Sequence, residues 1–576
     1  MPSSILLKNA TILVPASEQA DDVVALRHHS LLIEDNKIAQ IASEITPPLS
    51  ETKVLDCTGK IVSPGFIDTH HHVWQTQLKG RHANHTLLEY MPTGNLQQVH
   101  YTPEDIFWGQ LGGCLEMLDA GTTTVVDHAH MNISPAHSTN GLEATMASGI
   151  RSVFCYTPTA KLKAWAPEFV PASDMLADWV LKQLDELGAA APWGDGRVQL
   201  GLAFDGFYLP KDVVLRLFER ARKAGVKLIT AHYVQGYFSN YGVLGRNVLL
   251  SHATNLTESD VKKLAKSKAW ISSTPDTELQ MGHGNPVCFR EDCADRTSLG
   301  IDCHSNNSSD IMTQMRLALQ YERAIQNEKS FVQGKLFRSL NLSVQDAFRL
   351  GTIQGARAIR MEDKVGSIKK GKLADLVIFN GRSPGMACAA EQDPVAAIVL
   401  HSSIRDVDTV IVDGQIRKQH GNLVPVNISP QLDGVKIPNQ RADWEKVVQE
   451  LLSSRKRIET AIEQAGANDY EHLILFLQKY INHGLISPRR SASLQPRAIS
   501  SAPAFSSRAP LSTKPDQTTQ EDTVHVEQHV AGFRELGLGP KTKIFLIVIL
   551  SVFGTLETWF WCETIYHWWK GDRTKA

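Results

Sequence analysis

The feature that most constrains the fold is a series of eight short apolar runs between residues 60 and 302, separated by stretches with helical periodicity. Runs of this kind are typical of strands buried on both faces, and their alternation with helices favours a parallel sheet. Eight such units predict an α/β fold with a closed (β/α)8 TIM barrel, in which chemistry gathers where strands end. The runs are KIVSPGFIDTH, TTTVVDHAH, IRSVFCYT, RVQLGLAF, VKLITAH, NVLLSHA, AWISST and SLGID.

Two hairpin patterns flank the barrel segment. HSLLIEDNKIAQIA places the turn Asp35-Asn36 between two β-rich runs, and TVIVDGQIRKQHGN repeats this design around Asp413-Gly414. Both patterns indicate hairpins of one small sheet domain.

The composition changes after the barrel. Residues 426–486 contain an amphipathic helical pattern, and we expect a helical extension that packs against the small sheet domain, with an interaction or lid role as the alternative. Residues 487–540 are rich in Ser, Pro and Ala, which predicts a disordered linker.

The last part of the chain contains the apolar run IFLIVILSVFGTLETWFW, at residues 544–561. Its length, its flanking lysines and the aromatic residues at its end favour a transmembrane anchor at 541–569, although Glu557 and Glu563 count against it. We expect a single-pass helix that tethers the rest of the chain on the cytosolic side of a membrane; a buried or interfacial helix is the alternative.

Charge and cysteine usage exclude several classes of protein. A formal net charge of −2 gives no global nucleic-acid signature. The eight cysteines have no paired spacing, as expected of thiols in a reducing compartment. The N-terminus lacks the pattern of a secretory signal.

Three consecutive histidines follow the first apolar run, in DTHHH. The period of two in a strand places His70 and His72 on one face and His71 on the other. Two imidazoles that converge in this way suit one divalent metal. We expect His71 to pack or to support its neighbours.

Other predicted strands also end in groups that can bind metal or move protons. LITAH ends at His232, LLSH at His252 and SLGID at Asp302. A lone histidine at a strand end is ordinarily structural, but five such groups at one end of a barrel indicate a functional site. His128 and His130, in VVDHAHM, have the same i, i+2 spacing; we favour supporting positions for them over pocket positions.

These motifs resemble the metal-dependent amidohydrolase superfamily, in the branch that holds triazine hydrolases and cytosine, guanine and adenosylhomocysteine-type deaminases. The resemblance rests on PGFIDTHHH, ITAH, LLSH, LGIDCHSN and TIQGARAIRMEDKVGSIKKGKLADLVIFN, and it covers roughly residues 1–425. It implies a barrel at 64–364 and a small β-sandwich built from 1–63 and 365–425. It also implies that His70, His72, His232 and Asp302 bind one metal, and that His252 assists catalysis.

The resemblance implies hydrolysis at an sp2 carbon of a small nitrogen heterocycle, cyclic amide or imine, by deamination or other C–N cleavage. A metal held by three imidazoles and a carboxylate lowers the pKa of bound water and supplies a nucleophile. Asp302 can take a proton from that water, and His252 can stabilise developing negative charge. VQLGLAFDGFY carries no lysine that could bridge two metals, so we expect one divalent ion, zinc first and iron as the alternative.

One position departs from the branch. Gln235 stands where these deaminases carry a glutamate that moves protons to the leaving nitrogen, and an amide cannot do this. Glu278 supplies the acid from another wall of the pocket, or the leaving group needs no proton, or Asp302 and His252 act alone; we favour them in that order.

Trp74, Gln75, Gln235 and His283 are candidates for contact with a planar ring. Two alternatives to C–N hydrolysis stay open: removal of a non-nitrogen leaving group or elimination, and a tethered binding protein that has lost turnover. The intact set of histidines and Asp302 favours an enzyme. The sequence is also compatible with a homo-oligomer.

Overall fold

The computed structural model describes residues 4–164, 170–171, 175–207, 209–234, 240–336, 339–466 and 474, all within one compact unit, Met1–Arg489. The predicted linker and anchor, at 487–540 and 541–569, lie outside the described residues, as does Gln235. Within the described ranges, no helix combines the length and the apolar character needed to cross a membrane.

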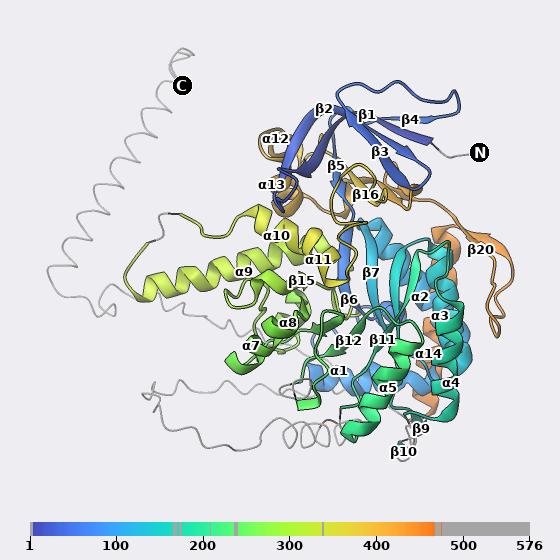
Figure 1. The fold of residues 1–576 in the computed structure, drawn as a ribbon. Helices are drawn as coiled ribbons and strands as arrows, with labels where there is room; N and C mark the ends of the chain where they lie inside the picture. Colours follow the sequence, from blue (N-terminus) through green and yellow to red (C-terminus); the bar gives the residue numbers. More distant parts are fainter. Residues whose placement is uncertain are drawn as a thin grey trace, which may run out of the picture. The chain divides into compact units, whose positions relative to one another are not determined.

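An eight-stranded parallel sheet forms the centre of the fold (Figure 1). Each predicted run contributes one of its strands. The sheet nearly closes into a barrel, because the backbone N–H of Asp302, after the last strand, donates to the carbonyl of His70 on the first at 2.8 Å. The strands are β6 (Phe66–His71), β7 (Thr122–Ala129), β8 (Arg151–Tyr156), β11 (Val198–Ala203), β12 (Ile229–His232), β13 (Val248–Ser251), β14 (Trp270–Ser273) and β15 (Thr297–Leu299).

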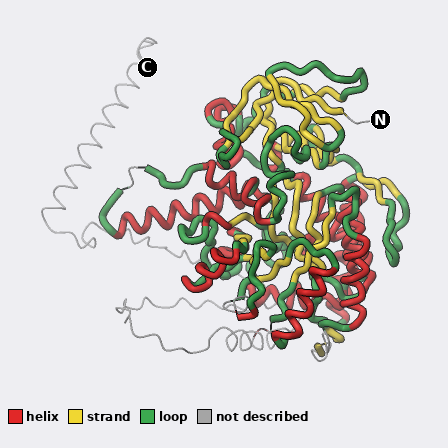
Figure 2. Tube along the Cα trace, in the orientation of Figure 1, coloured by secondary structure: helices red, strands yellow, loops and turns green. Residues whose placement is uncertain are grey.

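Helices surround these strands, as the red segments around the yellow barrel show in Figure 2. Most of them follow a barrel strand in sequence, as βα units require. They include α1 (Leu87–Thr93), α2 (Pro103–Asp119), α3 (Pro135–Ser148), α4 (Asp178–Ala190), α5 (Lys211–Lys223), α7 (Glu258–Ser267), α8 (Pro275–Gln280), α9 (Ile311–Val332), α10 (Val344–Leu350) and α11 (Ile353–Ala358).

A second, nine-stranded sheet joins the two flanks of the chain, as predicted. Strand β5 pairs antiparallel with β16, with Ser63 opposite Val377, and this pairing connects the N-terminal strands to the C-terminal ones. The strands are β1 (Ser4–Pro15), β2 (Val23–Glu34), β3 (Lys37–Ala42), β4 (Lys53–Asp56), β5 (Lys60–Pro64), β16 (Leu376–Asn380), β17 (Val407–Val412), β18 (Gln415–Gln419) and β19 (Asn422–Leu423).

The two predicted hairpins meet at their turns. Asp413 and Gly414 both have positive φ, as a tight two-residue hairpin turn requires. A Cβ atom on Gly414 would lie 2.1 Å from the carbonyl oxygen of Asp35, so only glycine allows this approach. The Asn36 amide also donates to Asp413 at 3.2 Å.

The run KIVSPGFIDTH supplies strands to both sheets, and it divides beside the 63/64 boundary that the resemblance implies. The chain leaves the second sheet at Pro64 and enters the barrel at Phe66. Gly65 makes the transition, where a Cβ atom would lie 2.1 Å from Thr123 Oγ1. The close backbone approach at this glycine ends one sheet and begins the other.

The helical extension contains α14 (Trp444–Gln464), which lies beside α2 and the 3-10 helix η1 (Val73–Leu78). Ser454 of α14 donates to Asp105 at 2.6 Å and accepts from the Gln77 amide at 3.0 Å. Arg457 also reaches Asp105, at 2.6 Å. A buried polar contact therefore connects this helix to the segment that follows the three histidines.

Candidate active site

His70 and His72 lie on one face of the end of β6 and converge on a single carboxylate. The Nε2 atom of each ring is 3.1 Å from Asp302 Oδ1. The Nδ1 atom of His70 lies 2.8 Å from Ser251 Oγ, and that of His72 lies 3.2 Å from the His128 carbonyl. These outer partners fix both rings with Nε2 toward the site.

His232, the last residue of β12, is held by a carboxylate that we did not predict. Asp205 accepts from the His232 backbone N–H at 2.9 Å and lies 3.0 Å from its Nδ1 atom. The same oxygen, Oδ2, is 3.0 Å from Nε2 of the buried His128. Asp205 therefore orients His232 so that its Nε2 atom is the one available for ligation, and it joins His128 to the site.

Asp302 and His252 both follow barrel strands and both have a φ of +66°. His252 Nε2 is 3.8 Å from Asp302 Oδ2. Burial raises the pKa of Asp302, but the imidazoles of His252, His70 and His72 outweigh it and hold this pKa well below its usual value. Burial lowers the pKa of His252 to about 4. The site thus pairs an ionised carboxylate with a neutral imidazole.

The donor set fits a divalent metal. Ligand atoms of His70, His72, His232 and Asp302 all lie within 4.8 Å of one another. Three imidazoles with a carboxylate suit zinc or iron. The members come from β6, β12 and the end of β15, so barrel closure brings them together.

Glu278, on α8, lies behind His252. Its side chain is fully buried, with Oε1 3.7 Å from His252 Nδ1. Thr274 lies between them, with Oγ1 2.8 Å from His252 Nδ1 and 3.5 Å from Glu278 Oε1. Burial raises the pKa of Glu278 to about 7, against the hydrogen bonds from Thr274 and Ser273.

The candidates for substrate contact occupy different surroundings. The His283 ring lies 4.7 Å from that of His252, beside the site. Trp74 is buried, with its ring edge-on to those of Tyr101 and His130. Gln75 is also buried, and its amide donates to the Tyr90 hydroxyl. The structure does not bring Gln75 to the metal-ligand cluster.

His71 points away from the cluster, as its position on the strand predicts. Its Nδ1 atom is 2.6 Å from Asp68 Oδ2, and its Nε2 atom is 2.7 Å from His304 Nδ1. The other oxygen of Asp68 accepts from the backbone N–H groups of His70 and Ile301. This buried network supports the seam between β6 and β15, directly beneath the HxH pair.

Sequence reasoning missed Asp205, Thr274 and His304. Asp205 and Thr274 left a usable signal, because Asp205 directly follows the predicted run RVQLGLAF and Thr274 ends the predicted run AWISST, where barrel chemistry gathers. Thr274 and His304 act through contacts between loops that are distant in sequence.

Comparison with known proteins supports the resemblance to metal-dependent amidohydrolases. Residues 61–233 and 215–417 match the Amidohydrolase family. A 5-methylthioadenosine/S-adenosylhomocysteine deaminase of Thermococcus sibiricus is 28% identical over 453 residues, covering 72% of this chain and 93% of that protein. A 5′-deoxyadenosine deaminase of Methanothermobacter thermautotrophicus is 26% identical over 445 residues, covering 72% and 95%.

Solved structures share the fold at lower identity. An adenosine deaminase from Xanthomonas campestris with bound zinc has a TM-score of 0.62 and 19% identity, covering 80% of this chain and 99% of that one. Atrazine chlorohydrolase from Arthrobacter aurescens, complexed with zinc, has a TM-score of 0.62 and 18% identity, covering 78% and 100%. The family match, which spans the barrel and part of the nine-stranded sheet, confirms the predicted resemblance: the chain belongs to the amidohydrolase family.

Proposed function

We propose that this chain is a zinc-dependent deaminase that hydrolyses the exocyclic C–N bond of an adenosine-type nucleoside. Water adds to the sp2 carbon that bears the amine, and ammonia leaves. The observation that carries the proposal is the convergence of His70, His72, His232 and Asp302, with His252 beside them. The substrate class comes from the two related deaminases described above, which are named for adenosine-type substrates.

A divalent metal bound by this cluster would activate water as a nucleophile. Asp302, ionised and next to the HxH pair, is placed to accept the proton that this water loses. His252 is neutral, and in this proposal its Nδ1 atom accepts from the Thr274 hydroxyl, so that the proton on Nε2 is donated to the heterocycle. The imidazole of His252 then stabilises the negative charge that develops on the nitrogen of the heterocycle.

Glu278 acts through its neighbours in this proposal. Its burial behind His252 keeps it from direct contact with substrate, while Thr274 connects the two side chains. A pKa of about 7 lets Glu278 release and recover a proton near neutral pH. The proton reaches the leaving nitrogen by way of Thr274 and His252, so Glu278 replaces the acid that Gln235 cannot provide.

A second candidate is removal of a leaving group other than an amine. Gln235 favours it, because a group such as chloride leaves without protonation. The products separate the two functions, since only deamination releases ammonia.

The test uses full-length protein loaded with zinc and offered adenosine, 5′-methylthioadenosine and S-adenosylhomocysteine. We expect ammonia release with the matching change in purine absorbance, and loss of both in His252→Ala. Glu278→Gln should reduce kcat far more than Gln235→Ala. Zinc-loaded protein without ammonia release from any of the three would contradict the substrate class, and the reverse ranking of the two variants would remove Glu278 from the mechanism.

We also propose that residues 541–569 anchor the enzyme to a membrane. The proposal rests on the length of the apolar run and its flanking lysines and aromatic residues.

A further inference from the structure

A second cavity, of about 680 Å³, lies between the barrel and the nine-stranded sheet. Its wall includes Arg151, at the start of β8, and Gln199, near the start of β11. Asn36 and Asp413, from the two hairpin turns, also line it. The cavity is therefore at the N-terminal ends of the barrel strands, whereas the histidine cluster is at their C-terminal ends.

Cations outnumber carboxylates around this cavity. Three aspartates line it, Asp195, Asp363 and Asp413. Five cationic side chains line it, from the second sheet, from the barrel and from the segment after α11: Lys37, Arg151, Lys227, Arg360 and Lys364. With the buried Asp375, which pairs with Arg151, counted as well, five positive charges against four negative ones leave a net charge of +1.

Arg151 is fully neutralised by carboxylates of the wall. Its guanidinium is 2.7 and 3.0 Å from the two oxygens of the buried Asp375, and 2.9 Å from Asp413. The other four cations have no such partner: within the described part of the chain, none of their side chains pairs with a carboxylate. Arg151 therefore has a structural role in the wall of the cavity, and the excess positive charge comes from the four exposed side chains.

Two more guanidinium groups lie next to the cavity wall. Arg197 is 7% exposed and stands between the lining residues Gly196 and Gln199. Burial and the charge of Arg197 together lower the pKa of Arg417 to about 10, against the effect of Asp413. The Nε atoms of Arg197 and Arg417 are both buried without a hydrogen-bond acceptor. Arg197 is also 3.6 Å from Asp195 and Arg417 donates to Gln415, so the two buried Nε donors are what a bound anion would satisfy.

We propose that this cavity binds a small soluble ligand with at least two phosphate charges, of the diphosphate class. Lys37, Lys227, Arg360 and Lys364 approach it from separate segments, so one multivalent anion can satisfy several of them at once. A ligand held there connects the second sheet to the barrel, and it stabilises the folded chain by mass action. The site does not depend on the deaminase chemistry at the other end of the barrel.

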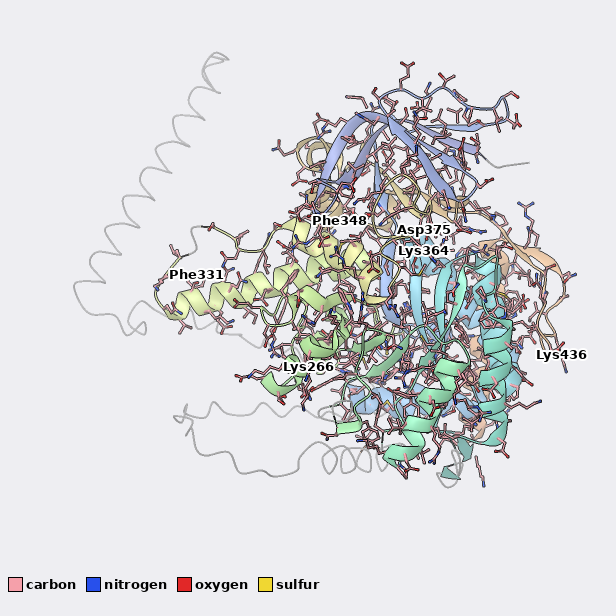
Figure 3. All side chains as sticks on the ribbon, viewed as in Figure 1. Lys266, Phe331, Phe348, Lys364, Asp375 and Lys436 are labelled. Carbon is pink, nitrogen blue, oxygen red and sulfur yellow. The ribbon has the colours of Figure 1, made fainter. Side chains whose placement is uncertain are left out.

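The test is isothermal titration of the full chain with inorganic pyrophosphate at constant ionic strength. The test variant is Lys227→Gln with Lys364→Gln. The control is Lys266→Gln with Lys436→Gln, which removes the same charge from exposed positions away from the cavity (Figure 3). Figure 3 shows Lys364 near Asp375, at the junction of the sheet and the barrel.

We expect wild type and control to bind one pyrophosphate per chain, and the cavity variant to bind at least about tenfold more weakly, as the loss of two charge-assisted contacts requires. Both variants should match wild type in thermal stability without pyrophosphate, because the substituted lysines are exposed. Three results would overturn the proposal. Wild type could fail to bind pyrophosphate, or the control could weaken as much as the cavity variant. The cavity variant could also bind as tightly as wild type, as it would if pyrophosphate bound at the metal centre.

Discussion

Asp205→Asn isolates the carboxylate that orients His232. In wild type, Oδ1 accepts from the His232 backbone N–H, while Oδ2 lies 3.0 Å from both His232 Nδ1 and His128 Nε2. An asparagine that keeps the backbone contact turns its amide donor toward His232 Nδ1. The ring would then carry its proton on Nε2, the nitrogen that must be unprotonated to bind metal.

The expected loss of zinc affinity follows from the replacement of a hydrogen-bond acceptor by a donor. Loss of such an outer carboxylate typically weakens metal binding about 10- to 100-fold, or roughly 1.4 to 2.7 kcal/mol. The Asp205 side chain is 39% exposed, so water can replace part of the lost interaction. We therefore expect the lower end of the range, about tenfold.

Zinc affinity is measured by competition with a chromophoric chelator, which needs no knowledge of the substrate. Asp185→Asn is the matched control, because Asp185 pairs with Arg220 on the exposed surface. Zinc binding by Asp205→Asn as tight as that of wild type, or equally weakened binding in the control, would refute the orienting role.

Three further outcomes are expected. His72→Ala should lose metal in elemental analysis of the purified protein, and full occupancy would argue against the cluster as a metal site. Glu278 has a folded-state pKa of about 7 against a usual 4.5, so its contribution to stability is intact below pH 4.5 and falls as pH rises toward 7. The unfolding free energy of Glu278→Gln relative to wild type should therefore increase by roughly 3 kcal/mol between pH 4 and pH 8 in urea titrations; pH-independent differences would contradict the buried carboxyl. A chain that ends at residue 486 should be soluble and active, whereas its persistence in the membrane fraction would rule out 541–569 as the anchor.

The barrel could be predicted from the sequence because each strand is a local pattern. All eight apolar runs contain a barrel strand, and the alternation within DTHHH separated His71 from the HxH pair. The hairpin turn at Asp413-Gly414 was equally local. The break at Gly65 was not, because it depends on the approach of Thr123 from the neighbouring strand.

The surroundings of the site required three-dimensional contacts. The sequence suggested Glu278 as an acid for the site. Only the fold shows that its side chain is buried behind the imidazole of His252 and connected to it through Thr274. Trp74 follows the HxH pair closely in sequence, yet its ring packs against Tyr101 from a later segment. Proximity in sequence therefore located the site, while the direction of each side chain depended on partners far along the chain.

The contact between α14 and η1 has a mechanical consequence. A force applied to the chain beyond residue 466 reaches the core through α14, whose Ser454 and Arg457 share Asp105. Gln77, bonded to the same serine, lies five residues from His72. Tension that reaches α14 therefore acts on the contacts at Asp105 and Gln77, in the segments that lead to the HxH pair.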